Sequence, residues 1–175
     1  LADNVSAADM ATRLYFQLKY FGEDRIAVLN GGLQAWLAAG YPVATDALAA
    51  KQGDWKAATE RKEILATTAD VKAALKDGKT QLVDGRPIAQ FFGISKSPVV
   101  AAAGHLEGAK ALPAEAIAMP VGASQQFMNA RQYTAIYKEQ GIDASKPSIS
   151  YCNTGHFASG AWFVASEIMQ QKDAK

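Results

Sequence analysis

The chain has 175 residues, of which 49% are hydrophobic and 20% are charged, and this composition is typical of a globular protein. Its formal charge of +1 is nearly neutral, so no strong field favours binding to nucleic acid or to an anionic membrane. No apolar stretch approaches the roughly 20 residues that a membrane-spanning helix needs. Cys152 is the only cysteine, which excludes an internal disulfide and a multi-cysteine metal cluster. With only two histidines beside it, we expect no metal site.

The first part of the chain combines a helical pattern with a short apolar run. Apolar residues at helical spacing predict an amphipathic helix over 8–21, whose apolar face carries Met10, Leu14, Leu18 and Phe21. The apolar run 25–29 ends in Asn-Gly-Gly and predicts a buried strand followed by a tight turn. A short helix is predicted over 33–39. Periodicity is then lost, and we assign 47–62 as a linker.

From about residue 63 onward, short strands and helices alternate. The elements predicted there, in chain order, are a strand at 64–66, a helix from Thr67 or Thr68 to Leu75, a strand at 81–83, a helix at 124–140, a strand at 148–151 and a helix at 158–171. Such alternation favours an α/β fold, with a parallel sheet flanked by helices on both faces. Ligands of these sheets bind outside the carboxyl ends of the strands. Asp84, Arg86 and Cys152 all follow strands, so we expect them to meet at that edge.

Cys152 stands between a predicted strand and a predicted helix. A strand, a short loop and a helix in this order direct several backbone N–H groups inward, and the helix adds the positive end of its dipole. Both effects favour the thiolate over the thiol, which makes the sulfur nucleophilic near neutral pH. The alternative is a structural cysteine buried at the end of a strand, as free cysteines often are. The position directly before a helix favours the functional interpretation.

Several stretches resemble those of one known family. The loop at 152–158, Cys-Asn-Thr-Gly-His-Phe-Ala, resembles the active-site loop of rhodaneses, the thiosulfate and 3-mercaptopyruvate sulfurtransferases. Residues 84–87 (Asp-Gly-Arg-Pro) and 104–109 (Gly-His-Leu-Glu-Gly-Ala) resemble two further elements of that family, in the same order. Residues 28–43 resemble the end of the first domain in members that have two domains in tandem. The resemblance implies the rhodanese-like fold.

The resemblance also implies a division of the chain. Residues 1–46 would be the C-terminal part of a non-catalytic rhodanese-like domain, and 63–175 a catalytic domain that lacks its last strand and helix. The chain would then be incomplete at both ends, with the remainder of the same protein as one expected partner. In the alternative arrangement, a circularly permuted single domain, residues 8–43 supply the missing strand and helix, and 26–29 pair with 149–151.

The resemblance implies covalent sulfur transfer. Cys152 would take sulfur from a small anionic donor, thiosulfate or 3-mercaptopyruvate, hold it as a persulfide and pass it to cyanide or a thiol, without a cofactor. Arg86 would orient the donor or brace the loop. The alternative, which is compatible with either role, is an ion pair with Asp84 or another carboxylate, and His105 would be structural. The residues expected to bind substrate or brace the loop are Asp84, Arg86, Asn153, Thr154, Gly155, His156 and Phe157.

The chain departs from the family pattern at two places. The loop carries Asn153, Thr154 and His156 where thiosulfate-preferring members often have basic residues, and Gln90 replaces a second expected basic residue. Both departures weaken the case for thiosulfate as the donor.

A rhodanese-like sulfur carrier or binding module without turnover is the alternative function. A cysteine phosphatase is disfavoured, since Ala158 to Gly160 supply no loop-closing arginine. The sequence leaves the compartment open, with the cytoplasm favoured over the periplasm.

Overall fold

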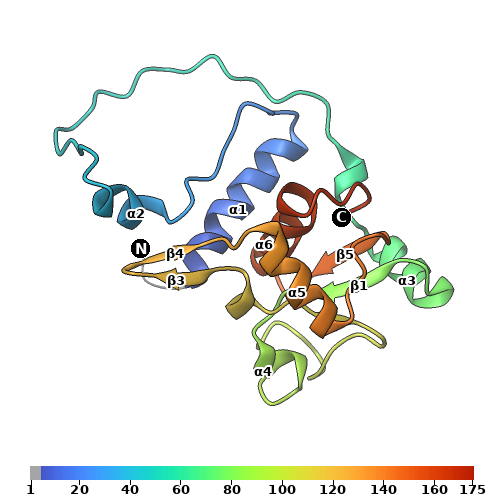
Figure 1. Cartoon of the computed structure of the whole chain (residues 1–175). Helices are drawn as coiled ribbons and strands as arrows, with labels where there is room; N and C mark the ends of the chain where they lie inside the picture. The colour runs from blue at the N-terminus through green and yellow to red at the C-terminus, as the bar shows by residue number, and fades with distance from the viewer. Residues whose placement is uncertain (1–4) are drawn as a thin grey trace.

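The computed structural model describes residues 5–175, so residues 1–4 of the segment predicted over 1–46 lie outside the described part of the chain. Its centre is a parallel sheet of three strands in the order β2-β1-β5 (Figure 1). These strands are β1 (Gln81–Asp84), β2 (Lys110–Ala111) and β5 (Ser148–Tyr151). In the register of β1 and β5, Asp84 lies opposite Tyr151. The carboxyl end of β1 therefore meets the start of the Cys152 loop, as the sequence predicted.

Helices cover both faces of this sheet. Helix α3 (Thr68–Asp77) covers one face, where Leu82, Ile149 and Ala74 form a buried cluster. Helices α5 (Ala130–Gln140) and α6 (His156–Phe163) cover the other face, where Val83 joins a larger core. Adjacent residues of β1 thus enter opposite cores, as expected of a strand buried on both sides. The predicted fold class is confirmed.

The outer edge of β5 pairs with the last residues of the described chain. The Ser148 N–H donates to the Asp173 carbonyl at 3.1 Å, the Ser150 N–H to the Lys175 carbonyl at 2.7 Å, and the Lys175 N–H to the Ser148 carbonyl at 2.9 Å. The strand predicted over 25–29 is wrong, because this run lies beside α1 (Val5–Tyr20) without ladder pairing in the described structure. Since 173–175 occupy the edge of β5, the circular permutation is rejected.

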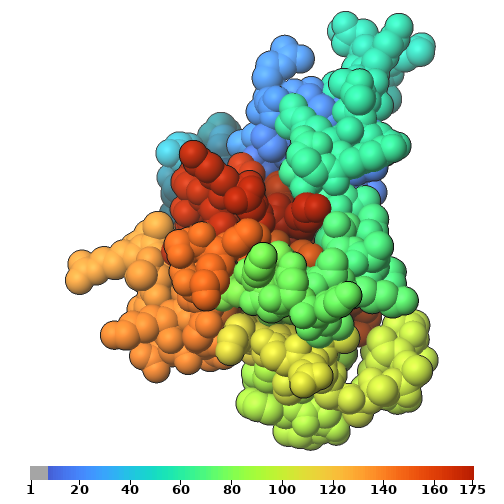
Figure 2. Space-filling view, turned by 90° about the vertical axis from the view of Figure 1, so that its right-hand side faces the viewer, coloured from blue at the N-terminus to red at the C-terminus, as the bar shows by residue number. Residues whose placement is uncertain are grey.

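The predicted helix at 124–140 starts too early and the predicted strand at 64–66 is absent, because local hydrogen bonding differs from the predicted pattern at both places. Residues 124–126 form β4 (Ser124–Gln126), which pairs with β3 (Met119–Val121) in a hairpin, instead of the start of a helix. The hairpin extends to the left in Figure 1, away from the face of the molecule shown in Figure 2. Helix α5 begins only after Asn129, which caps it by accepting the Gln132 N–H at 3.0 Å. The predicted strand at 64–66 is also wrong, since a 3₁₀ turn, η1, spans Lys62–Ile64.

Helix α1 packs along α6, and its buried face differs from the predicted one (Figure 1). Met10 and Leu14 of the predicted apolar face are 56% and 59% exposed, whereas Asp9 and Thr12 are buried. Aromatic side chains complete the contact, with the Phe16 ring edge-on against the Trp162 ring at 4.9 Å. The cause is the surface of α6, which presents small residues opposite Asp9 and Thr12 and rings opposite Phe16.

The remaining elements are short. Helix α2 (Gly32–Ala38) follows α1, and the exposed segment after it returns to the body through a hydrogen bond from the Ala58 N–H to the Phe21 carbonyl, 2.9 Å. Helix α4 (Ile88–Phe91) and the 3₁₀ turn η2 (Ala114–Ala116) flank β2 in the sequence. Within the described residues, no helix has the length and hydropathy to cross a membrane.

Candidate functional site

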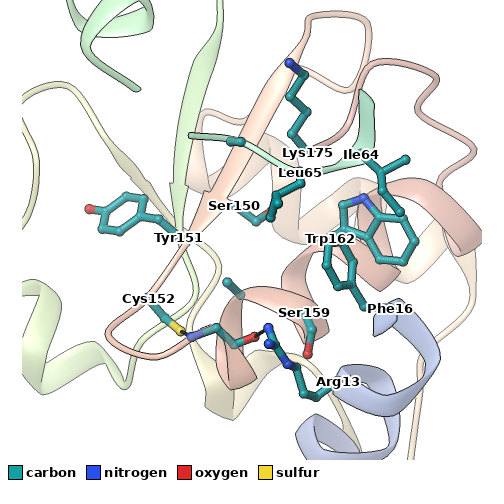
Figure 3. A pocket seen from close by; sticks show the side chains of 13 residues that line it. Arg13, Phe16, Ile64, Leu65, Ser150, Tyr151, Cys152, Ser159, Trp162 and Lys175 are labelled. Atoms are coloured by element: carbon teal, nitrogen blue, oxygen red, sulfur yellow. Dashed lines mark hydrogen bonds between the residues drawn. The ribbon is translucent and has the colours of Figure 1, made fainter. Parts of the chain in front are cut away.

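Cys152 lies directly after β5, half-buried, and its sulfur is held by the backbone. The Gly155 N–H donates a hydrogen bond to Cys152 Sγ, with 3.0 Å between nitrogen and sulfur (Figure 3). Gly155 has a φ of 90°, a conformation that favours glycine, and it is the residue before α6. The sulfur therefore lies at the positive end of this helix. The sequence predicted several inward amides, and among the described residues the hydrogen bond to Sγ comes from Gly155.

Asp84 and Arg86 form a buried fork beside the cysteine loop. Arg86 donates from Nη2 and Nε to the two oxygens of Asp84 at 2.6 and 2.9 Å, and its backbone N–H also donates to Asp84. The same Nη2 reaches the Gly104 carbonyl at 2.8 Å. Hydrogen bonding to Asp84 raises the pKa of Arg86 above its ordinary value. Nε and Nη2 of Arg86 thus link Asp84 to the Gly104 carbonyl, and the ion pair with Asp84, one of the predicted alternatives, is present.

Gly85, between these two residues, allows α6 to approach the sheet. A Cβ atom on Gly85 would lie 2.9 Å from the carbonyl oxygen of Phe157 and 3.1 Å from its carbonyl carbon. Both atoms belong to the backbone of the first turn of α6, which cannot move aside easily. Phe157 thus enters the site through its peptide group, and Gly85 sets the distance between β1 and the start of α6.

The other predicted loop residues divide into two groups. Asn153 donates from its side-chain amide to the Gln90 side-chain oxygen at 2.9 Å, which ties the loop to α4. Thr154 and His156 are exposed, and their side chains lie 3.4 Å apart between Oγ1 and Nδ1. The polar pair of Gln90 and Asn153 therefore occupies the place where the family resemblance led us to expect basic side chains.

His105 is held by packing. Its ring stacks on Phe91 with 3.9 Å between centroids and 6° between planes, and its Nδ1 lies 2.8 Å from the Phe91 carbonyl oxygen. The neighbouring Leu106 N–H donates to the Tyr151 hydroxyl at 3.2 Å. These contacts fit the structural role predicted for His105.

Two cavities adjoin Cys152. The α1-side cavity has a volume of about 210 Å³, and its lining includes Arg13, Cys152, Gly155 and Lys175 (Figure 3). The second, of about 250 Å³, lies on the Arg86 side, next to His105. Because Gly155 lines the α1-side cavity and donates to Sγ, the sulfur borders that cavity.

Sequence reasoning missed Arg13. This residue of α1 donates from Nη1 to the Gly155 carbonyl at 3.4 Å, so a helix assigned to the non-catalytic segment contacts the cysteine loop. No local pattern around residue 13 indicates this contact, because it depends on how α1 packs against α6.

The family follows from a comparison with known proteins. A model of the family described as "Rhodanese-like domain" matches residues 67–173, which is more than half of the chain. The chain belongs to the rhodanese-like family. The predicted family is confirmed, and its matched region holds the Asp84–Arg86 fork and Cys152.

Relatives of this rhodanese-like chain share the family but are longer. The thiosulfate sulfurtransferase of Cricetulus griseus is 28% identical over 147 residues, covering 83% of this chain and 48% of that protein. The sulfur carrier protein TtuD of Thermus thermophilus is 29% identical over 168 residues, covering 91% and 58%. The chain thus spans about half the length of the curated relatives it matches.

The fold of the rhodanese-like chain also matches a solved structure. The 3-mercaptopyruvate sulfotransferase SseA from Escherichia coli superposes with a TM-score of 0.80 and 24% identity, covering 96% of this chain and 61% of that one. This likeness supports the assignment of the fold. Within the described residues, no group of three or more His, Cys, Asp or Glu side chains is placed to hold a metal ion.

Proposed function

We propose that the chain is a sulfurtransferase in which Cys152 accepts sulfane sulfur and carries it as a persulfide. The observation that carries this proposal is the position of Sγ. This atom accepts a hydrogen bond from the Gly155 N–H at the start of α6, and it borders a cavity. A hydrogen-bond donor and a helix N-terminus both stabilise negative charge on sulfur. The same groups suit the negative charge of a persulfide, as fixed donors suit an oxyanion.

The first step is attack of the Cys152 thiolate on the outer sulfur of the donor. With thiosulfate, a new S–S bond forms at Cys152, the S–S bond of thiosulfate breaks, and sulfite leaves with the electron pair. With 3-mercaptopyruvate, the C–S bond breaks and the leaving enolate takes a proton to become pyruvate. Each reaction leaves a negatively charged outer sulfur bonded to Sγ, the atom that accepts the Gly155 N–H in this structure.

The second step returns Cys152 to its thiolate form. Cyanide or a thiolate attacks the outer sulfur of the persulfide, the S–S bond breaks, and the electron pair returns to Cys152. With cyanide the product is thiocyanate, and with a thiol it is a new persulfide. The two steps form a ping-pong cycle.

In this proposal the remaining site residues hold the loop in place. Asp84 and Arg86 brace the segment around Gly104 through their buried fork. Asn153 ties the loop to Gln90, while Thr154 and His156 lie exposed where they can meet the donor or acceptor. The neutral pair of Gln90 and Asn153 leaves 3-mercaptopyruvate and thiosulfate both open as donors.

A sulfur carrier is the second candidate function, and the similarity to the sulfur carrier protein TtuD favours it. A carrier would take up one sulfur at Cys152 but would transfer it slowly to small acceptors. The two candidates therefore share the first step and differ in the second.

Steady-state turnover separates the candidates. Thiocyanate formation is measured with each donor plus cyanide, for the wild type, Cys152→Ser and the exposed control Arg131→Gln. A sulfurtransferase gives many turnovers with at least one donor, Cys152→Ser gives none, and Arg131→Gln matches the wild type. A carrier gives a single turnover. Wild-type activity that survives in Cys152→Ser would overturn the role of this cysteine, provided that far-UV circular dichroism shows both proteins folded.

A further inference from the structure

Arg13 packs directly against the residue that holds the sulfur. Its Nη1 donates to the Gly155 carbonyl at 3.4 Å, and a Cβ atom on Gly155 would lie 2.5 Å from the same nitrogen. Figure 3 shows the two hydrogen bonds of Gly155 in sequence, from Sγ to its N–H and from its carbonyl to Arg13. Arg13 is half-buried and lines the same cavity as Cys152.

Arg13 differs from Arg86 and Lys175, the other cations that line the two cavities, in its ion pairing. Arg86 is paired with Asp84 at 2.6 Å, and Lys175 with Asp70 at 3.6 Å. Within residues 8–175, Arg13 has no carboxylate oxygen within 4.0 Å. The other titratable groups near the loop include the histidines 105 and 156 and Tyr151, whose burial raises its pKa well above the ordinary value. Asp9 of α1 lies against Gly160 of α6, and burial raises its pKa to about 7.

The distance from the guanidinium to the sulfur is short enough for an effective charge interaction. The contacts through Gly155 and ordinary bond lengths keep Nη1 within about 9 Å of Sγ. This is similar to the Debye length of about 8 Å at physiological ionic strength, and partly buried charges are screened less than exposed ones. The positive charge of Arg13 therefore acts on whatever negative charge the sulfur or a bound donor carries.

We propose that Arg13 is a positioning residue of the sulfur-transfer site: it fixes Gly155 and makes the α1-side cavity attractive to a small anionic donor. The segment 67–173 offers Gln90, Asn153 and Thr154 where cations were expected. Helix α1 supplies instead a cation, Arg13, that has no carboxylate partner within residues 8–175. The donor class is a small molecule with a sulfonate-like or carboxylate group beside its transferable sulfur. This inference rests on the proposed function, because it concerns the same cysteine.

The test compares a neutral and an anionic reagent for the same thiol. Iodoacetamide and iodoacetate both alkylate Cys152 with loss of iodide, and only iodoacetate carries a charge. The ratio of the iodoacetate rate to the iodoacetamide rate therefore reports the electrostatic potential at the sulfur. A change in the exposure of Cys152 or in the fraction of folded protein alters both rates alike and cancels in the ratio. The variants are Arg13→Lys and Arg13→Gln, and the matched control is Arg25→Gln, whose side chain is 92% exposed.

We expect Arg13→Gln to lower the ratio of the iodoacetate rate to the iodoacetamide rate about three- to tenfold, because the anionic reagent loses its attraction to the guanidinium. The midpoint of the alkylation pH profile should rise by a fraction of a pH unit. Arg13→Lys should retain most of the ratio, and Arg25→Gln should match the wild type. Added salt should lower the wild-type ratio, a measurement that needs no variant and therefore holds even if Arg13→Gln fails to fold.

A ratio that is unchanged in Arg13→Gln, or a wild-type ratio that is insensitive to salt, would overturn the role of Arg13. Alkylation is measured without a sulfur donor, so this outcome leaves the sulfurtransferase assignment intact. Failure of the wild type to take up sulfur would refute the proposed function, whatever the alkylation ratio.

Discussion

At the scale of single residues, the fork between Arg86 and Asp84 is the most constrained contact beside the cysteine. Asp84 is fully buried, and Arg86 serves both its carboxylate and the Gly104 carbonyl. A lysine cannot reproduce this geometry, because its single ammonium lacks the planar fork. We expect Arg86→Lys to lower the free energy of unfolding by about 2 kcal/mol or more, since Asp84 keeps a buried charge with fewer donors.

Urea denaturation measures this loss, with Arg131→Lys on the exposed face of α5 as the control. The control should stay within about 0.5 kcal/mol of the wild type. An Arg86→Lys protein as stable as the control would show that the fork contributes little to the fold.

Gln90 carries the second prediction at this scale. Its side chain accepts a hydrogen bond from Asn153, so an arginine at residue 90 would place a cation beside the loop. We expect Gln90→Arg to lower the KM for thiosulfate several-fold, because a dianionic donor gains more from an added charge than a monoanionic one. Gln52→Arg, in the exposed linker, adds the same charge at a remote place and should leave KM unchanged. If Gln90→Arg and Gln52→Arg lowered KM equally, the effect would come from the net charge of the protein and not from the position of residue 90.

At the scale of secondary structure, the approach of α6 to β1 depends on Gly85. A methyl group at residue 85 would press on the backbone of Phe157, and the start of α6 would have to shift away from the strand. We expect Gly85→Ala to cost about 1–3 kcal/mol of stability and to lower turnover, since the shift also displaces Gly155. Gly53→Ala is the matched control, because a Cβ atom there meets nothing within 4 Å. Turnover that is unaffected by Gly85→Ala would mean that the cysteine loop is positioned independently of β1.

Much of the sheet and site was predictable from local signals, and the rest depends on contacts between distant segments. The strands at 81–83 and 148–151 were predicted because each is a short run next to turn residues, the first before Asp84-Gly85 and the second after Pro147. A parallel sheet then brings Asp84 close to Cys152. The run at 25–29 has a similar local pattern, yet it lies beside α1 and pairs with no strand among the described residues, while 173–175 hold the outer edge of β5. The contact between Arg13 and Gly155 likewise follows from helix packing and leaves no trace in the sequence around either residue.

At the scale of the whole molecule, the packing of α1 on α6 encloses Asp9. Its carboxylate is buried, neither oxygen has a hydrogen-bond partner among the described residues, and a Cβ atom on Gly160 would lie 2.7 Å from Oδ1. Burial raises the pKa of Asp9 from 3.8 to about 7. The folded chain therefore binds this proton more tightly than the unfolded chain does. The stabilisation that this proton binding gives the folded chain is complete below the pKa of Asp9 in the unfolded chain. It is lost as the pH rises through the pKa of Asp9 in the folded chain, about 7.

We expect the free energy of unfolding to fall by up to about 4 kcal/mol between acidic and neutral pH on account of Asp9. Asp9→Asn keeps the shape and removes the titration, so it should be more stable than the wild type at pH 8 and lose most of the difference at pH 5. Urea denaturation at both pH values checks this, and the comparison with Asp9→Asn cancels the titration of other groups. Parallel pH profiles of the two proteins would contradict an enclosed, protonated Asp9.

The central claim is that the sulfur of Cys152 is the atom that receives the transferred sulfur, and mass spectrometry of a single loading step tests it most directly. The chain is incubated with thiosulfate or 3-mercaptopyruvate without an acceptor, its intact mass is recorded, and the modified peptide is mapped before and after cyanide is added. The account predicts one added sulfur atom on the peptide that contains Cys152, lost to cyanide and absent in Cys152→Ser. A wild-type chain that gains no sulfur from either donor, or gains it away from Cys152, would contradict the account.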